Sequence, residues 1–287
     1  MPELPEVETI AAGLRRKISG RVIEEVRLFL PKLLRADPPS VLGELRGARI
    51  LRVGRRGKLL VISCDEERLL LFHLKMIGQF LWADSGAPVD RHTRLLVRFR
   101  DLPRELRFRD VRKFGFLRYH RGPDTSSCAE IAALGPEPLE IGRIAFLRRL
   151  EVRRGRLKSL LLDQRFVAGI GNIYADEILY ASRLHPLTRA ADLKPEEAVG
   201  LWSAMRSVLR RAVRAGGSSI RDYADDEGSE GSFQFRHRAY GRAGRPCRRC
   251  GNAIRRVVVG GRATFFCPLC QRRRNSSGRR PRACPPN

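Results

Sequence analysis

Residues 247–270 read "CRRCGNAIRRVVVGGRATFFCPLC" and carry the most specific pattern in the chain. Two Cys-x-x-Cys pairs, sixteen residues apart, offer four thiolates: Cys247, Cys250, Cys267 and Cys270. Each pair can hold one side of a tetrahedral Zn²⁺, and the segment between them, with Gly260 and Gly261 at its centre, is typical of a β-hairpin. Four thiolates leave no open coordination position. The pattern therefore predicts one structural zinc ion, with a redox use of the thiols as the alternative.

The region around this hairpin is strongly basic. The 287 residues include 57 Lys and Arg against 31 Asp and Glu, a net charge of +26, and residues 232–287 contain fifteen arginines with no Asp, Glu or Lys. Such an excess indicates a polyanionic partner, and nucleic acid is the usual one. A cationic surface kept only for solubility is the alternative, and the uneven placement of the charge argues against it.

The chain shows no membrane or export signal. No stretch approaches the roughly 20 consecutive apolar residues of a membrane span, and the basic end lacks the apolar face of an interfacial helix. The N-terminus has no charged leader followed by an apolar core. We therefore expect a cytoplasmic, reducing compartment, in which the seven cysteines do not form disulfides. Three cysteines belong to no recognisable pattern: Cys64, Cys128 and Cys284.

Apolar periodicity organises the rest of the chain. A helical stripe predicts a helix over residues 5–18. Between Val22 and Tyr119, short segments rich in β-branched and aromatic residues predict an antiparallel sheet domain in two layers. Residues 121–140 have the turn-rich composition of a linker. Three helical segments follow: "RLKSLLLDQ", "GNIYADEILYASRL" and "KPEEAVGLWSAMRSVLRRAVRAGG".

The first residues, "MPELPEVETI", place a proline directly after Met1 with a carboxylate beside it. Glu6 and Glu8 lie near the start of the predicted helix, where the positive end of the helix dipole favours acidic side chains. Glu3 precedes the predicted helix, so that explanation does not cover it.

Motifs spread over residues 1 to about 271 resemble the bacterial formamidopyrimidine-DNA glycosylase family. In chain order they are "PELPEVET", "RRGKLLV", "HLKMIGQF", "RDVRKFG", "LLDQRFVAGIGNIYADEILY", "GGSSIRDY" and "GGRATFFCPLCQ". The related endonuclease VIII family usually begins with PEGPE, so the first residues favour the glycosylase family.

The resemblance implies an α+β multidomain protein. Its parts are an N-terminal β-sandwich with a leading helix, a helical domain with a helix–two-turns–helix motif, and a C-terminal β-hairpin zinc finger. The expected boundaries are 1–120 for the sandwich, 121–140 for the linker, 141–235 for the helical domain with a lesion-capping loop, 236–271 for the zinc finger and 272–287 for a basic disordered tail.

In this family Met1 is removed and the nitrogen of Pro2 is the nucleophile. A chain-terminal amine has a pKa of about 8, against about 10.4 for lysine, so more of it is unprotonated at neutral pH. Its attack on C1′ expels the damaged base and leaves an iminium ion, and elimination of the 3′ and then the 5′ phosphate follows. The resemblance makes Glu3 the general acid and Lys58 the acid of the later elimination. It makes Glu6 a supporting carboxylate and Arg262 the member of the catalytic set that binds a phosphate.

To reach C1′, such an enzyme must turn the nucleotide out of the duplex and fill the space left behind. The resemblance assigns that space to Met76, Arg112 and Phe114, whereas ordinary core packing is the alternative for the two apolar residues. It also predicts DNA contacts by His92, Lys158 and Asn172. The family often has His-x-His at residues 92–94, and Arg94 replaces the second histidine, although an arginine can still hold a phosphate.

The sequence thus predicts a bifunctional base-excision-repair enzyme, with one structural Zn²⁺ per chain. It would act as a monomer, excise 8-oxoguanine and formamidopyrimidines from double-stranded DNA, and cleave at abasic sites. Residues 216–234 correspond to the family loop that closes over an everted oxidised purine. Two alternatives stay open: an endonuclease VIII-like glycosylase for oxidised pyrimidines, and a non-catalytic zinc-dependent DNA-binding protein. The joint presence of the catalytic set argues against a pure binder.

Overall fold

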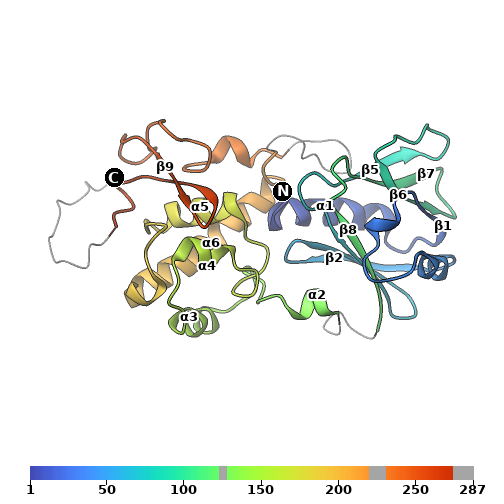
Figure 1. Cartoon of the computed structure of the whole chain (residues 1–287), viewed down its shortest axis with the longest axis horizontal. Coiled ribbons are helices and arrows are strands. Elements are labelled where there is room, and N and C mark those ends of the chain that lie inside the picture. The colour runs from blue at the N-terminus through green and yellow to red at the C-terminus, as the bar shows by residue number, and fades with distance from the viewer. Residues whose placement is uncertain (123–127, 220–230, 274–287) are drawn as a thin grey trace. The chain divides into compact units, whose positions relative to one another are not determined.

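The computed structural model describes residues 1–122, 128–219 and 231–273 (Figure 1). The middle of the predicted lesion-capping loop and nearly all of the predicted basic tail lie outside the described residues. The chain forms two compact units. The first comprises Met1–Leu134 and Ala212–Gln234, and the second comprises Gly135–Arg211 and Phe235–Asn287.

The first unit contains a leading helix, α1 (Leu4–Ile18), and two four-stranded antiparallel sheets. One sheet has the order β1 (Ile23–Leu28), β6 (Thr93–Phe99), β7 (Arg104–Arg109), β5 (Gln79–Asp84). The other has the order β2 (Ile50–Arg56), β3 (Leu59–Cys64), β4 (Arg68–His73), β8 (Phe116–Arg121). Two short 3-10 helices, η1 (Pro31–Leu33) and η2 (Pro39–Leu45), connect β1 to β2. The predicted sandwich with its leading helix is confirmed.

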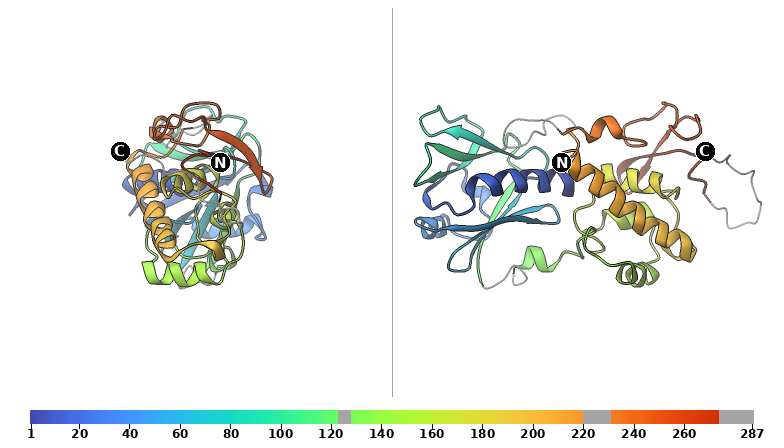
Figure 2. Two further views of the ribbon diagram at one scale, coloured as in Figure 1. Left: turned by 90° about the vertical axis from the view of Figure 1, so that its left-hand side faces the viewer. Right: turned by 180° about the vertical axis from the view of Figure 1, so that it is seen from behind.

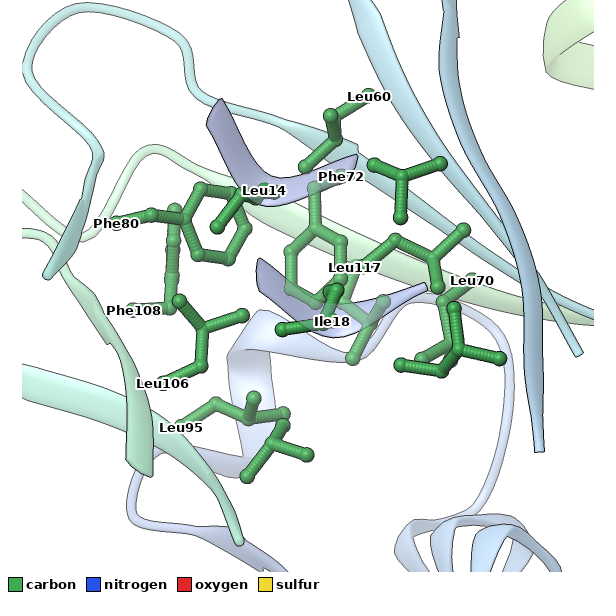
Figure 3. Packing of buried hydrophobic residues seen from close by; sticks show 14 of the residues in the cluster. Leu14, Ile18, Leu60, Leu70, Phe72, Phe80, Leu95, Leu106, Phe108 and Leu117 are labelled. Atoms are coloured by element: carbon green, nitrogen blue, oxygen red, sulfur yellow. The ribbon is translucent and has the colours of Figure 1, made fainter. Parts of the chain in front are cut away.

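The core of this unit joins α1 to both sheets (Figure 3). Leu14 and Ile18 of the helix are fully buried, and Phe72 packs edge-on against Phe80 with ring centres 5.0 Å apart. Helix α1 lies along strand β2 (Figure 2). Arg15 Nε of the helix donates to the carbonyl of Val53 on that strand at 2.8 Å. Because the helix is anchored in the core from its first turn, the residues just before it have little freedom to move.

Part of the predicted linker 121–140 is packed rather than extended. Helix α2 (Ala129–Ala132) places Ile131, together with Cys128, against apolar side chains of β3, β4 and β8. The turn-rich composition of the segment concealed this short apolar pair. Cys128 is therefore a small core residue of the first unit.

The second unit is helical and ends in the zinc-binding hairpin. Its elements are α3 (Arg143–Glu151), α4 (Leu157–Leu162), α5 (Asn172–Ala181), η4 (Ala190–Asp192), most of α6 (Pro195–Arg214), η5 (Phe233–Arg236) at its boundary, β9 (Arg255–Val259) and β10 (Arg262–Phe266). Helix α3 was not predicted, because only Phe146 and Leu150 of its arginine-rich sequence are buried. The predicted hairpin turn is confirmed: Val259 pairs with Arg262, and Gly260 and Gly261 have φ of 55° and 73°.

Residues 212–234 belong to the first unit by their contacts, although the sequence assigned them to the helical domain. One contact of this segment with the head of α1 is the hydrogen bond from the N–H of Ser218 to Glu6, described below. Among the described residues, no helix is both long and apolar enough to cross a membrane.

Candidate functional site

The head of helix α1 is buried. Pro2 and Glu3 are enclosed, Glu3 with only 3% of its surface exposed, whereas Met1 is 44% exposed. The carboxylate of Glu6 accepts a hydrogen bond from the backbone N–H of Glu3 at 2.8 Å. This contact satisfies an N–H at the start of the helix and fixes the backbone next to Pro2.

The second oxygen of Glu6 reaches a distant part of the chain. Its Oε1 accepts a hydrogen bond from the N–H of Ser218 at 2.7 Å, and Glu6 is only 2% exposed. Gly217, with φ of 78°, makes this approach possible, since a Cβ there would lie 2.7 Å from the same oxygen. Glu6 therefore joins the head of the helix to the start of the segment 216–219.

The two described ends of the predicted lesion-capping loop are tied together. The N–H of Phe233 donates to the carbonyl of Gly217 at 2.9 Å, and the N–H of Gly231 donates to Ser219 Oγ at 2.8 Å. Gln234 adds a further bond, because its Oε1 accepts from the N–H of Ser219 at 3.0 Å. These bonds form a closed neck from residues 216–219 and 231–234, held beside the head of α1.

Lys58 occupies the two-residue turn between β2 and β3 and is only 7% exposed, so it is not an ordinary solvated surface lysine. His73, at the end of β4, is a residue that the sequence analysis missed. The pKa of His73 is lowered to about 3, mainly by burial and in smaller part by the nearby charges of Lys75, Lys58 and Arg35. Its Nδ1 accepts from the N–H of Lys75 at 3.0 Å, which leaves the proton of the neutral ring on Nε2. The motif "HLKMIGQF" could have pointed to it, since it begins with this histidine.

Met76, Arg112 and Phe114 lie in turns of the first unit and face solvent. Met76 is 42% exposed and Phe114 is 51% exposed, so core packing does not explain either of them. The guanidinium carbon of Arg112 lies 4.9 Å from the ring centre of Phe114, a cation–π contact. Large exposed apolar side chains of this kind indicate a contact surface.

Asn172 is the first residue of α5, preceded by the "GIG" segment. Its Nδ2 donates to the carbonyl of Ala263 on β10 at 2.8 Å, and its Oδ1 is buried without a hydrogen-bond partner in the described structure. Gln164 holds the segment by accepting from the N–H of Gly169 at 2.9 Å and donating to the carbonyl of Ile170 at 2.8 Å. The N-terminus of α5 carries the partial positive charge of a helix dipole, which favours a nearby anion.

Lys158 is fully buried and makes an ion pair instead of facing solvent. Its Nζ lies 2.7 Å from Asp176 Oδ1 and donates to the carbonyl of Asn172 at 3.0 Å. Asp176 Oδ2 accepts from the N–H of Phe265 on β10 at 3.0 Å. Burial raises the pKa of Asp176, and the charge of Lys158 offsets part of that rise. The predicted phosphate contact by Lys158 has no support in this geometry, because its ammonium group is enclosed and holds α4, α5 and β10 together.

We expect Lys158→Met to destabilise the second unit by about 3–5 kcal/mol, because it leaves Asp176 buried without its cation. The double variant Lys158→Met/Asp176→Asn removes both charges and should recover part of that loss. Denaturant unfolding followed by Trp202 fluorescence, in a Trp82→Phe background, reports on this unit alone. Equal stability of Lys158→Met and the parent would contradict the structural role.

The four predicted zinc ligands are brought together. Their sulfur atoms lie within 4.8 Å of one another, with Cys247 and Cys270 3.9 Å apart and Cys250 and Cys267 3.5 Å apart. Tetrahedral coordination with Zn–S bonds of about 2.3 Å requires sulfur atoms about 3.8 Å apart. The four thiols therefore fit one zinc ion, and their number makes it a structural ion.

Arg262 begins strand β10, directly after the hairpin turn, and is exposed. The residues that follow it are fixed to α5, since Ala263 is bonded to Asn172 and Phe265 to Asp176. Arg262 is thus an exposed cation on a rigid support. The predicted site residues are divided between the two units, with Arg262, Asn172 and Lys158 in the second.

Comparison with known families matches three parts of the chain. The models of the formamidopyrimidine-DNA glycosylase N-terminal domain and H2TH domain match residues 1–117 and 134–224. A zinc finger found in FPG and IleRS matches residues 244–273.

Individual proteins are similar over nearly the whole chain. A formamidopyrimidine-DNA glycosylase of Heliobacterium modesticaldum is 44% identical over 278 residues, which cover 95% of this chain and 100% of that protein. A Lactococcus lactis FPG mutant in complex with Fapy-dG-containing DNA has a TM-score of 0.89 and 34% identity, covering 95% of this chain and 100% of its own. The wild-type L. lactis FPG with DNA containing an oxidised pyrimidine has a TM-score of 0.87 and 33% identity, with the same coverage. The chain therefore belongs to the formamidopyrimidine-DNA glycosylase family.

Proposed function

We infer that this chain is a base-excision-repair DNA glycosylase that removes oxidised purines, namely 8-oxoguanine and formamidopyrimidines, and then cleaves the strand at the abasic site. The observation that carries this proposal is the buried head of α1 in a chain of this family. There Glu3 directly follows Pro2, and Glu6 accepts a hydrogen bond from the N–H of Glu3.

The proposed reaction begins once Met1 has been removed. The nitrogen of Pro2 attacks C1′, and the base leaves with the electron pair of its bond to C1′ and takes up the proton that the amine loses. The bond from C1′ to the ring oxygen then breaks, Glu3 donates a proton to that oxygen, and the nitrogen lone pair forms the C=N bond. The resulting iminium ion withdraws electrons from the sugar. Its C2′ proton is then lost, which allows the 3′ phosphate to leave, and Lys58 serves as the acid in the later elimination of the 5′ phosphate. Glu6 supports the site by fixing the backbone at Glu3.

The second unit supplies phosphate contacts in this proposal. Asn172, at the N-terminus of α5, and Arg262, on the anchored strand β10, carry amide and guanidinium donors suited to phosphate oxygens. His92 adds a contact from the first unit. Met76, Arg112 and Phe114 fill the space that the everted nucleotide leaves, as their exposure allows.

We expect the affinity for lesion-containing duplex to fall steeply with salt, because several cationic side chains displace counterions from phosphates. Arg262→Met should lower the slope of log affinity against log salt by about 0.9, the value for one lost phosphate contact. Lys158→Met should leave the slope unchanged, because that lysine is buried. Titrations at several salt concentrations measure both, and an affinity that barely changed with salt would contradict the binding model.

The proposal is tested by borohydride trapping on a duplex with 8-oxoguanine opposite cytosine. A covalent protein–DNA adduct is the expected result, and a protein that binds the duplex without forming it would be a non-catalytic binder. A parallel reaction on thymine glycol tests a second candidate substrate class, the oxidised pyrimidines. This candidate is kept because wild-type L. lactis FPG has been solved with DNA that contains an oxidised pyrimidine. Faster excision of thymine glycol would reverse the substrate assignment. A monomeric state and a bacterial cytoplasmic location complete the proposal, together with the expected boundaries of the sandwich (1–120), the linker (121–140) and the zinc finger (236–271).

A further inference from the structure

Arg94 is an almost buried cation near the start of β6, with 8% of its surface exposed. Its Nε donates to the carbonyl of Asp110 at 2.8 Å and its Nη1 to the carbonyl of Arg91 at 3.1 Å, while its Nη2 lies 3.4 Å from His92 Nδ1. A bidentate phosphate contact needs a guanidinium fork that is open to the ligand. The fork of Arg94 is directed at the protein instead, so this geometry does not make it the phosphate ligand that an arginine at this position can be.

Asp110, which receives the bond from Arg94 Nε, closes the turn that follows β7. It is 1% exposed, and its Oδ1 accepts from the N–H of Arg112 at 3.0 Å while its Oδ2 accepts from the N–H of Gly115 at 2.7 Å. There is little room in the turn, since a Cβ at Gly115 would lie 3.0 Å from Oδ2 and 2.9 Å from the ring of Phe108. One carboxylate therefore spans the whole turn from residue 110 to residue 115.

The outer side of this turn is formed by four exposed residues, 111–114. Lys113 has φ of 58°, the left-handed conformation that reverses the chain and brings Arg112 next to Phe114. A second bond from the inner side reinforces the turn, because the N–H of Asp110 donates to the carbonyl of His92 at 3.0 Å.

We propose that Arg94 and Asp110 are positioning residues for base eversion. Asp110 holds the turn 110–115 from within, and Arg94 fixes the same turn to the loop that carries His92. Arg112 and Phe114 are thereby kept in one arrangement before DNA binds, so that less conformational entropy is lost when they enter the duplex. The inference rests on the proposed function, which gives these two side chains the space of the everted nucleotide.

The proposal separates two steps of the reaction. Excision of a paired 8-oxoguanine requires eversion and filling of the vacated space, whereas an abasic site has no base to evict. Loss of positioning should therefore slow the first reaction much more than the second. A residue that contacts a phosphate should affect both through binding, and a residue needed only for folding should affect both equally.

The experiment compares Arg94→Met, Arg94→Lys and Asp110→Asn with the parent under single-turnover conditions. Substrates are duplexes with 8-oxoguanine opposite cytosine and with a pre-formed abasic site, and a neighbouring 2-aminopurine reports eversion in stopped flow. We expect excision and the 2-aminopurine signal to slow by roughly tenfold to hundredfold, as for other misplaced groups, and abasic-site cleavage to stay within about threefold. Lysine should not rescue, since it cannot reach three acceptors at once. Arg104→Met, at the other end of β7, removes an exposed arginine as the matched control.

Three outcomes would overturn the proposal. Two are unchanged excision and equal slowing on both substrates. The third is rescue by Arg94→Lys together with a fall of about 0.9 in the salt slope of Arg94→Met, which would make Arg94 a phosphate ligand. Melting curves identify a variant that fails to fold, and the other two then carry the test. If the parent itself cleaved neither substrate, the proposed function would fail, and the inference with it.

Discussion

A chain that keeps Met1, or that carries an N-terminal tag, should excise no 8-oxoguanine and cleave no abasic site. The nitrogen of Pro2 is then part of an amide, whose lone pair is delocalised into the carbonyl and cannot attack C1′. No neighbouring residue can easily take its place, because the backbone at Glu3 is fixed by Glu6 and α1 begins at Leu4. Gel assays of both substrates, with mass spectrometry of the N-terminus of each preparation, measure the effect.

The control for this prediction is the same tag at the C-terminus, which should leave both activities intact. Pro2→Gly keeps a terminal amine without the ring, so weak residual activity is expected. Lys58→Ala should still form a trapped adduct at an abasic site, because Lys58 assists the chemistry without forming the covalent bond. Mass spectrometry should locate the sugar remnant on the peptide that starts at Pro2. Its location on Lys58 would overturn the mechanism and leave the substrate class intact.

The second large effect concerns the zinc site. Cys247→Ser or Cys270→Ser should release the ion and abolish tight DNA binding, while the first unit stays folded. Among the described residues, the hairpin has a small core that it shares with α5. Its buried members are Tyr180, Ala239, Cys247, Ile254 and Cys267, so two of the five are themselves zinc ligands. In such a small module metal binding supplies much of the folding free energy. Without it, Arg262 loses its rigid support.

Metal analysis and duplex titration measure these losses, and Trp82 fluorescence in a Trp202→Phe background follows the first unit. Cys128→Ser is the matched control, since it changes a buried thiol of the first unit and should leave zinc content unchanged. A zinc-free variant that bound and cleaved normally would contradict the role proposed for Arg262.

Much of the fold follows from local sequence signals. The apolar stripe over 5–18 became α1, and the glycine pair at 260–261 became the hairpin turn, because each signal is complete within a few neighbouring residues. The cysteine spacing likewise defined its site. Helix α3 was missed because a helix with two buried positions and several arginines has almost no apolar periodicity.

Two residues near the site could not be placed from the sequence, because their partners are distant in it. The resemblance predicts that Lys158 contacts DNA, whereas the structure pairs it with Asp176, eighteen positions later. The sequence leaves the effect of Arg94 open, because its acceptor, the carbonyl of Asp110, lies sixteen positions away. Which side chain a buried charge meets is decided by tertiary packing, which no pattern within one segment can report.

The two hydrogen bonds of Glu6 have a thermodynamic consequence. One carboxylate binds the N–H of Glu3 and that of Ser218, which lie at opposite ends of the first unit's sequence. The two segments are therefore coupled through one carboxylate, whose two oxygens accept one bond each. The coupling free energy that one segment passes to the other through Glu6 is equal in the reverse direction. Under the proposed chemistry, a sugar attached to Pro2 would favour the ordered neck at 216–219, and an occupant held by that neck would favour the reactive position of the proline. Substrate recognition and nucleophile alignment would then be reciprocal effects of one side chain.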